Sequence, residues 1–106
     1  MIQDPDYARV FTMARCIAWS YGYAAVLHGS FTRDLDIVLI PWTNEASGDA
    51  DQLIAMIAQA ADLKPLKNDP VEKPHGRKSY TLLFPKFGDP RFIDIGVVPI
   101  VTEVNK

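Results

Sequence analysis

The sequence predicts a single α+β domain in which two main helices pack on one mixed sheet of about four strands. Two observations predict this class. In two segments the apolar residues recur at three- and four-residue spacing, which is typical of helices with one buried face. Four other segments are short apolar runs bounded by glycine, proline or polar residues, which is typical of strands. The order helix, strand, strand, helix, strand, strand favours helices packed on a mixed sheet.

Length and composition narrow the class further. The 106 residues suffice for one compact core, so residues 1–106 are interpreted as one domain. A net charge of −2 excludes a globally basic nucleic-acid coat. The lone Cys16 excludes a disulfide framework and a cysteine-based zinc site, and fits a reducing compartment. The acidic start and the absence of long apolar runs lead us to expect a cytoplasmic protein with no membrane partner.

The first helix is expected between Asp4, which can cap its N-terminus, and Gly22, which can end it in the left-handed conformation. Its apolar stripe is widened by Cys16 and Trp19, which are interpreted as core or helix-flank residues. The second helix is expected from the apolar stripe over residues 53–61, after a polar loop.

The expected strands cover residues 23–28, 35–40, 79–84 and 92–98. Pro41 stops the second of them. Residues 64–76 contain three prolines and are interpreted as an exposed loop, and residues 85–90 form a connection of hairpin length.

Three aspartates stand out because aspartate is depleted in strands. Asp34 and Asp36 alternate with apolar residues that face the other way, and Asp94 does the same on the last strand. If these two strands are neighbours, the three carboxylates converge and repel each other. A divalent cation with oxygen ligands, Mg²⁺ or alternatively Mn²⁺, would remove that repulsion.

Two other interpretations stay open. In the first, each aspartate is simply solvated on a wet face or at an edge of the sheet. In the second, Asp34 belongs to the turn after Gly29 and Ser30, and only Asp36 lies on the strand.

Residues 27–30 (Leu-His-Gly-Ser), 33–38 (Arg-Asp-Leu-Asp-Ile-Val) and 93–95 (Ile-Asp-Ile) together resemble the nucleotidyltransferase superfamily of polymerase-β type. The small size and the helix-first order resemble its minimal stand-alone members, including short uncharacterised members in bacterial and prophage genomes. The resemblance implies a single-domain nucleotidyltransferase-like fold.

The same resemblance implies roles for the residues. Asp34 and Asp36 would hold two Mg²⁺ ions that clamp a nucleoside triphosphate, and Asp94 would help bind the metal that activates an attacking hydroxyl. Gly29 and Ser30 would contact a phosphate. The implied activity is Mg²⁺-dependent transfer of a nucleotidyl group to an unknown acceptor, supplied by a partner chain or shared in a homo-oligomer.

Basic residues supply further phosphate-binding candidates. From Lys64 to Arg91 there are seven basic and three acidic residues. Arg33, Arg77 and Lys78 are the best candidates for phosphate contacts, and a solvated basic face is the alternative. His28, next to the Gly-Ser pair, is interpreted as a structural residue that hydrogen-bonds in the core near the site.

Two other function classes remain beside the transferase. The first is a catalytically degenerate domain of the same fold that serves as a binding or regulatory module. The second is a metal-dependent nuclease or nucleotide-sugar enzyme built on the same carboxylates.

Overall fold

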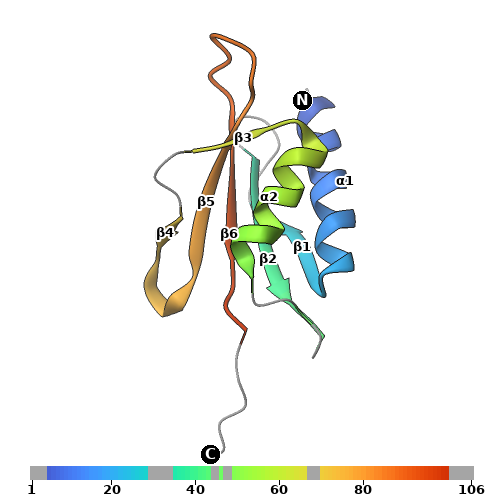
Figure 1. The fold of residues 1–106 in the computed structure, drawn as a ribbon, viewed down its shortest axis with the longest axis vertical. Helices are drawn as coiled ribbons and strands as arrows, with labels where there is room; N and C mark the ends of the chain where they lie inside the picture. Colours follow the sequence, from blue (N-terminus) through green and yellow to red (C-terminus); the bar gives the residue numbers. More distant parts are fainter. Residues whose placement is uncertain (1–4, 29–34, 44–45, 47–48, 67–69, 101–106) are drawn as a thin grey trace, which may run out of the picture.

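The computed structural model describes residues 5–28, 35–43, 46, 49–66 and 70–100. Figure 1 shows the order of the elements in this part of the chain. The helices are α1 (Pro5–Ser20) and α2 (Ala50–Ala61), with a short 3-10 helix, η1 (Pro74–Gly76). The strands are β1 (Tyr23–Leu27), β2 (Leu35–Pro41), β3 (Lys64–Pro65), β4 (Val71–Glu72), β5 (Lys78–Leu83) and β6 (Phe92–Val97).

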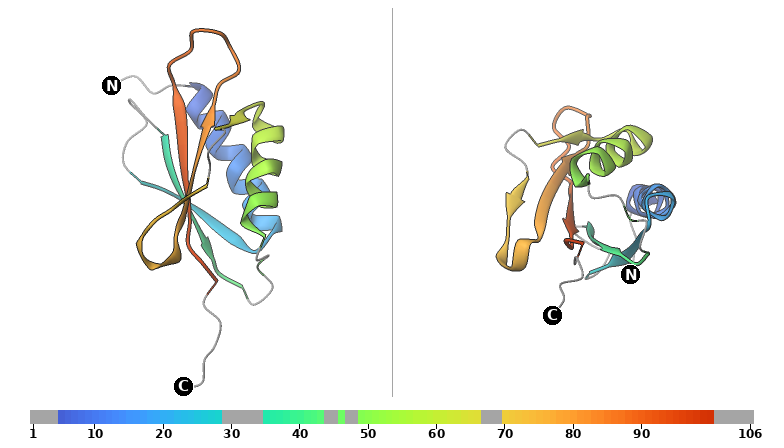
Figure 2. Two further views of the ribbon diagram at one scale, coloured as in Figure 1. Left: turned by 60° about the vertical axis from the view of Figure 1, so that its left-hand side comes forward. Right: turned by 60° about the horizontal axis from the view of Figure 1, so that its bottom comes forward.

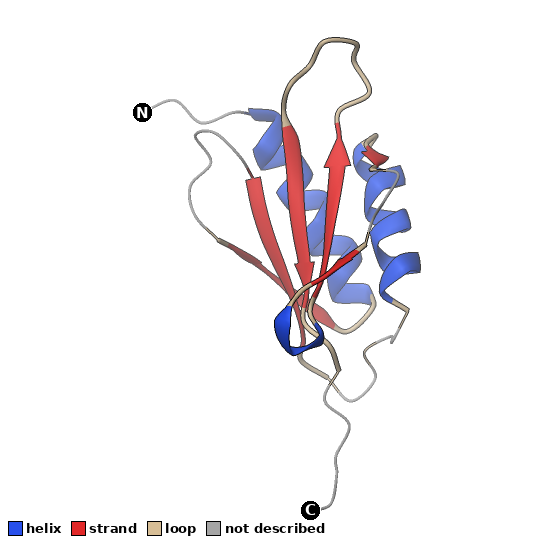
Figure 3. Cartoon of the chain, turned by 90° about the vertical axis from the view of Figure 1, so that its left-hand side faces the viewer, coloured by secondary structure: helices blue, strands red, loops and turns tan. Residues whose placement is uncertain are grey.

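The strands form one mixed sheet with the order β1-β2-β6-β5-β3, and β4 pairs with β5 beside this path. β2 and β6 run parallel, and the other pairs are antiparallel. Both α-helices lie on the same side of the sheet (Figures 2 and 3). The expected α+β class is therefore confirmed, and the sheet has one helix-covered face and one face that neither helix covers.

The core lies between the helices and the covered face of the sheet. Alternate residues of the central strands are buried there, because strand side chains point to opposite faces in turn. α1 contributes a stripe at helical spacing, and burial of each large apolar side chain contributes about 1.5–3 kcal/mol. The buried residues of these elements are Leu35, Ile37 and Leu39 of β2, Ile93, Ile95 and Val97 of β6, and Tyr7, Val10, Ala14 and Ala18 of α1.

Gly22 makes the turn from α1 into β1. Its φ of +86° lies in the left-handed region, and a Cβ there would come within 2.7 Å of both the Ala46 Cα and the Thr43 Oγ1. The Trp42 N–H donates to the Gly22 carbonyl oxygen at 3.0 Å. Glycine is therefore required both by the backbone conformation and by the close approach of the chain after β2.

The second helix starts earlier than its apolar stripe. Asp49 is the N-cap of α2, and its side chain accepts a hydrogen bond from the Gln52 N–H at 3.0 Å. Asp62 closes the helix in the left-handed conformation, with a φ of 61°. Asp49 and Asp51 thus both lie at the start of the helix, where negative charge stabilises the positive end of the helix dipole.

Arg91 ties the β5–β6 connection to α1. Its guanidinium donates to the Asp89 carboxylate at 2.8 and 3.0 Å and to the Asp6 Oδ2 at 2.9 Å. The group also lies over the Phe84 ring, 4.1 Å from its centroid. Hydrogen bonds from the Arg91 side chain, and then from its backbone N–H, lower the pKa of Asp89 to about 2.

The structure corrects one expectation about the fold and refines two others. The sheet has six strands rather than four, because the segment expected to be a loop contains β3, β4 and η1. Cys16 and Trp19 were expected in the core or on the helix flank, and the structure shows the second: both are exposed and lie outside the buried stripe of α1. Pro41 is the last residue of β2 rather than the residue after it.

Neither α-helix in the described part of the chain combines the length and the apolar character that crossing a membrane requires.

Candidate functional site

Asp36 and Asp94 lie side by side at the centre of the sheet. They are register partners on the neighbouring parallel strands β2 and β6. Adjacent strands lie about 4.8 Å apart, so the two aspartates are immediate neighbours. The residues before and after each aspartate are buried against the helices, so both carboxylates point to the uncovered face, where they are half-buried.

Two further polar residues extend this pair into a row across four strands. Thr81, on β5, is the register partner of Asp94, and its hydroxyl donates to the Asp94 Oδ1 at 3.1 Å. On the other side the His28 N–H donates to the Asp36 carbonyl oxygen at 2.9 Å. This bond continues the β1–β2 register by one residue, so the alternation of β1 puts His28 on the Asp36 face. We call His28, Asp36, Asp94 and Thr81 the polar row.

His28 corrects the sequence interpretation. It was expected to hydrogen-bond in the core, and it is exposed instead, because it follows the last residue of β1 on the face that the helices leave open. Thr81 was missed altogether. Its signal in the sequence is the alternation of β5, which sets Ser79, Thr81 and Leu83 against the buried Tyr80 and Leu82.

The remaining motif residues belong to the connection between β1 and β2. Gly29, Ser30, Arg33 and Asp34 lie outside the described residues. The convergence of the three carboxylates is therefore a finding for Asp36 and Asp94 and stays a prediction for Asp34.

The donor chemistry of the pair suits a hard cation. Carboxylate oxygens are the ligands that Mg²⁺ prefers, and Mg²⁺ is commonly held by one or two carboxylates together with phosphate oxygens and water. Within the described ranges no three histidine, cysteine, aspartate or glutamate side chains group closely enough to hold a metal ion. The predicted set of three includes Asp34, which those ranges leave out.

The two basic candidates next to β5 lie on opposite faces of the sheet. Lys78 pairs with the buried Val97, so its side chain is on the helix-covered face, away from the carboxylates. Arg77 lies on the carboxylate face, because a Cβ added to Gly96, two residues beyond Asp94, would meet the Arg77 Cδ at 3.7 Å. Of these two residues, Arg77 is thus the one that the fold brings toward the polar row.

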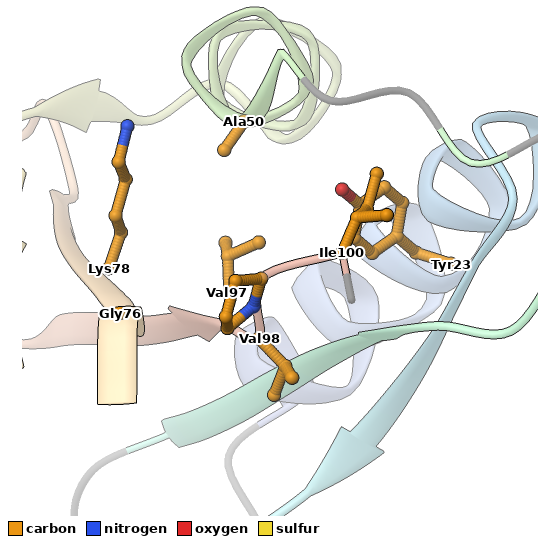
Figure 4. Close-up of a pocket in the computed structure, with 8 residues that line it drawn as sticks. Tyr23, Ala50, Gly76, Lys78, Val97, Val98 and Ile100 are labelled. Atoms are coloured by element: carbon orange, nitrogen blue, oxygen red, sulfur yellow. The ribbon is translucent and has the colours of Figure 1, made fainter. Parts of the chain in front are cut away.

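Lys78 instead lines a cavity of about 230 Å³ under the N-terminus of α2, together with Tyr23, Ala50 and Ile100 (Figure 4). The cavity lies on the helix-covered side of the sheet and none of the polar row lines it. The polar row therefore lies apart from this cavity, on the face of the sheet that neither helix covers.

No family model matches the sequence, and no curated protein is significantly similar to it.

Proposed function

We propose that this chain is a minimal nucleotidyltransferase-like protein that binds Mg²⁺ and a nucleoside triphosphate through Asp34, Asp36 and Asp94. In this proposal it transfers a nucleotidyl group to an acceptor hydroxyl held partly by another chain. A bound Mg²⁺ would neutralise phosphate charge and favour the deprotonated acceptor hydroxyl.

The observation that carries the proposal is the pairing of Asp36 with Asp94. Two carboxylates at register positions of adjacent parallel strands repel each other unless a cation or proton lies between them. Both are half-buried on an open face, which leaves them accessible to a ligand. A solvated surface pair would not need to occupy the two central strands of the sheet, where aspartate is disfavoured.

The neighbouring residues support the same use of this surface. The Thr81 hydroxyl donates to Asp94 Oδ1, and this hydrogen bond orients the carboxylate on the uncovered face of the sheet. Arg77 extends along the same face beside Gly96, where a guanidinium can meet phosphate oxygens. Lys78 has no part in the proposal, because it lies on the opposite face.

Binding is tested by thermal unfolding with and without MgCl₂ and ATP. A ligand at about 100 times its Kd stabilises the folded state by about 2.7 kcal/mol. We expect Asp36→Asn and Asp94→Asn each to abolish this gain. The matched control is Asp62→Asn, because Asp62 is exposed and its left-handed conformation also suits asparagine. No Mg²⁺-dependent gain for the natural sequence, or an equal gain in Asp36→Asn, would contradict the proposal.

Catalysis is tested separately by pyrophosphate release from each of the four nucleoside triphosphates. Release that needs Mg²⁺ and Asp36 supports transfer. Binding without release, in the presence of varied hydroxyl acceptors, would instead assign the chain to the binding or regulatory module that the sequence left open.

A further inference from the structure

The two edges of the sheet differ in how they are protected. The edge at β3 has only two residues, Lys64 and Pro65, and β4 beside it is equally short. Short strands, lysine and proline are the devices by which natural sheets prevent their edges from pairing with other strands. The edge at β1 has none of these: Tyr23–Leu27 is five residues long and contains no charge, proline or glycine.

The hydrogen-bonding pattern shows which groups of β1 point outward. The Gly22 carbonyl accepts from Trp42 N–H, and the His28 N–H donates to Asp36, so the even-numbered residues bond to β2. In an antiparallel pair the alternate residues point their N–H and C=O groups the other way. Ala25 and Leu27 therefore direct their backbone groups to the outer edge, where the described residues contain no further strand.

Apolar side chains surround this edge. Val26 is 45% exposed on β1, and Ile40 is 39% exposed on the neighbouring strand. At the start of β1, Trp19 and Trp42 stack with their ring centroids 4.6 Å apart, although both remain more than half exposed. Large apolar side chains gathered beside an unprotected edge mark an interaction surface.

We propose that β1 pairs with β1 of a second copy of this chain, in antiparallel orientation, so that two sheets join into one. An antiparallel pair of identical strands has two-fold symmetry, which is the commonest symmetry of soluble oligomers. With the two-fold axis near Ala25, each residue meets an uncharged residue of the other β1, so the strand does not repel itself. The Trp19–Trp42 stack of each copy then lies near the end of the other β1.

The experiment is sedimentation equilibrium of the full chain, without nucleotide or Mg²⁺, over about a hundredfold range of concentration up to about 1 mM. We expect a reversible dimer. Ala25→Pro removes an outward N–H without removing a bond to β2, so it should give a folded monomer. Val26→Lys places a charge on an exposed edge side chain and should do the same. The matched control, Val71→Lys at the 48% exposed Val71 of β4, should remain dimeric.

Circular dichroism checks that each variant is folded. If Ala25→Pro does not fold, the oligomeric state of Val26→Lys alone tests the proposal. A natural chain that stays monomeric throughout, or a dimer that survives in folded Val26→Lys, would overturn the proposal. Because no ligand is present, either result is independent of the proposed transferase activity.

Discussion

Gly22 and Gly88 have almost the same backbone conformation and very different surroundings. Their φ angles are +86° and +83°. A Cβ on Gly22 would lie 2.7 Å from the Ala46 Cα, whereas a Cβ on Gly88 would have no heavy atom within 4 Å. Replacing each glycine with alanine therefore separates the cost of the backbone conformation from the cost of the steric clash.

The conformational part is common to both variants. Placing a non-glycine residue in the left-handed region lowers the free energy of unfolding by about 1–2 kcal/mol. Alanine also restricts the unfolded chain more than glycine does, and this effect offsets about 0.4–1 kcal/mol of the loss. We therefore expect Gly88→Ala to lower the free energy of unfolding by about 1 kcal/mol. Gly22→Ala should lose a further amount of about 1–3 kcal/mol, because the crowded atom belongs to backbone and cannot rotate away.

Urea unfolding of both variants and of the natural sequence measures these differences, with equal m-values as the check on two-state behaviour. In thermal unfolding each 1 kcal/mol corresponds to about 4–8 °C for a domain of this size. Equal losses in the two variants would refute the inference that the chain after β2 packs closely on the α1–β1 turn.

Two other predictions concern polar contacts of the fold. Tyr80 is buried and its hydroxyl donates to Asp51 Oδ1 of α2, so Tyr80→Phe should lower the free energy of unfolding by about 1 kcal/mol in denaturant titrations; an unchanged stability would contradict this contact. The pKa of Asp89 is lowered from 3.8 to about 2 by its hydrogen bonds from Arg91, so its stabilising effect is present above about pH 4 and is lost as the pH falls through 2. The difference in melting temperature between the natural chain and Asp89→Asn should therefore be largest near neutrality and should vanish in strong acid, and a difference independent of pH would exclude the ion pair as its cause.

The elements with a clear period could be predicted from sequence. The alternation of Leu35, Ile37 and Leu39 around Asp36 gives both the strand and the face of the carboxylate, because one side of a strand must be buried. The same pattern around Asp94 predicts that face correctly. The parallel pairing of these two strands belongs to the tertiary structure. The sequence does not predict it, so the convergence of the carboxylates could only be expected on the condition that the strands are neighbours.

The rest had no local signal. β3 and β4 are two residues long, too short to show any period, and exist only because β5 offers them a partner. Trp19 lies on the side of α1 away from the core and is exposed. The sequence does not indicate this, because the apolar stripe is wide and includes Trp19. The separation of Arg77 from Lys78 depends on where β5 begins in the ladder with β6.

The central position of β6 has a consequence for folding. Asp36 and Asp94 are separated by more than half of the chain, and β6 is inserted between β2 and β5, which both precede it in sequence. Pairing β2 with β6 closes a long loop, which is entropically costly and typical of slow steps in folding. In a chain that folds from its N-terminus, α1, β1 and β2 therefore form first, and the edge of β2 that later pairs with β6 stays unpaired until β6 forms. The aspartate pair is thus assembled only in a protein whose sheet is complete, and partially folded forms lack it.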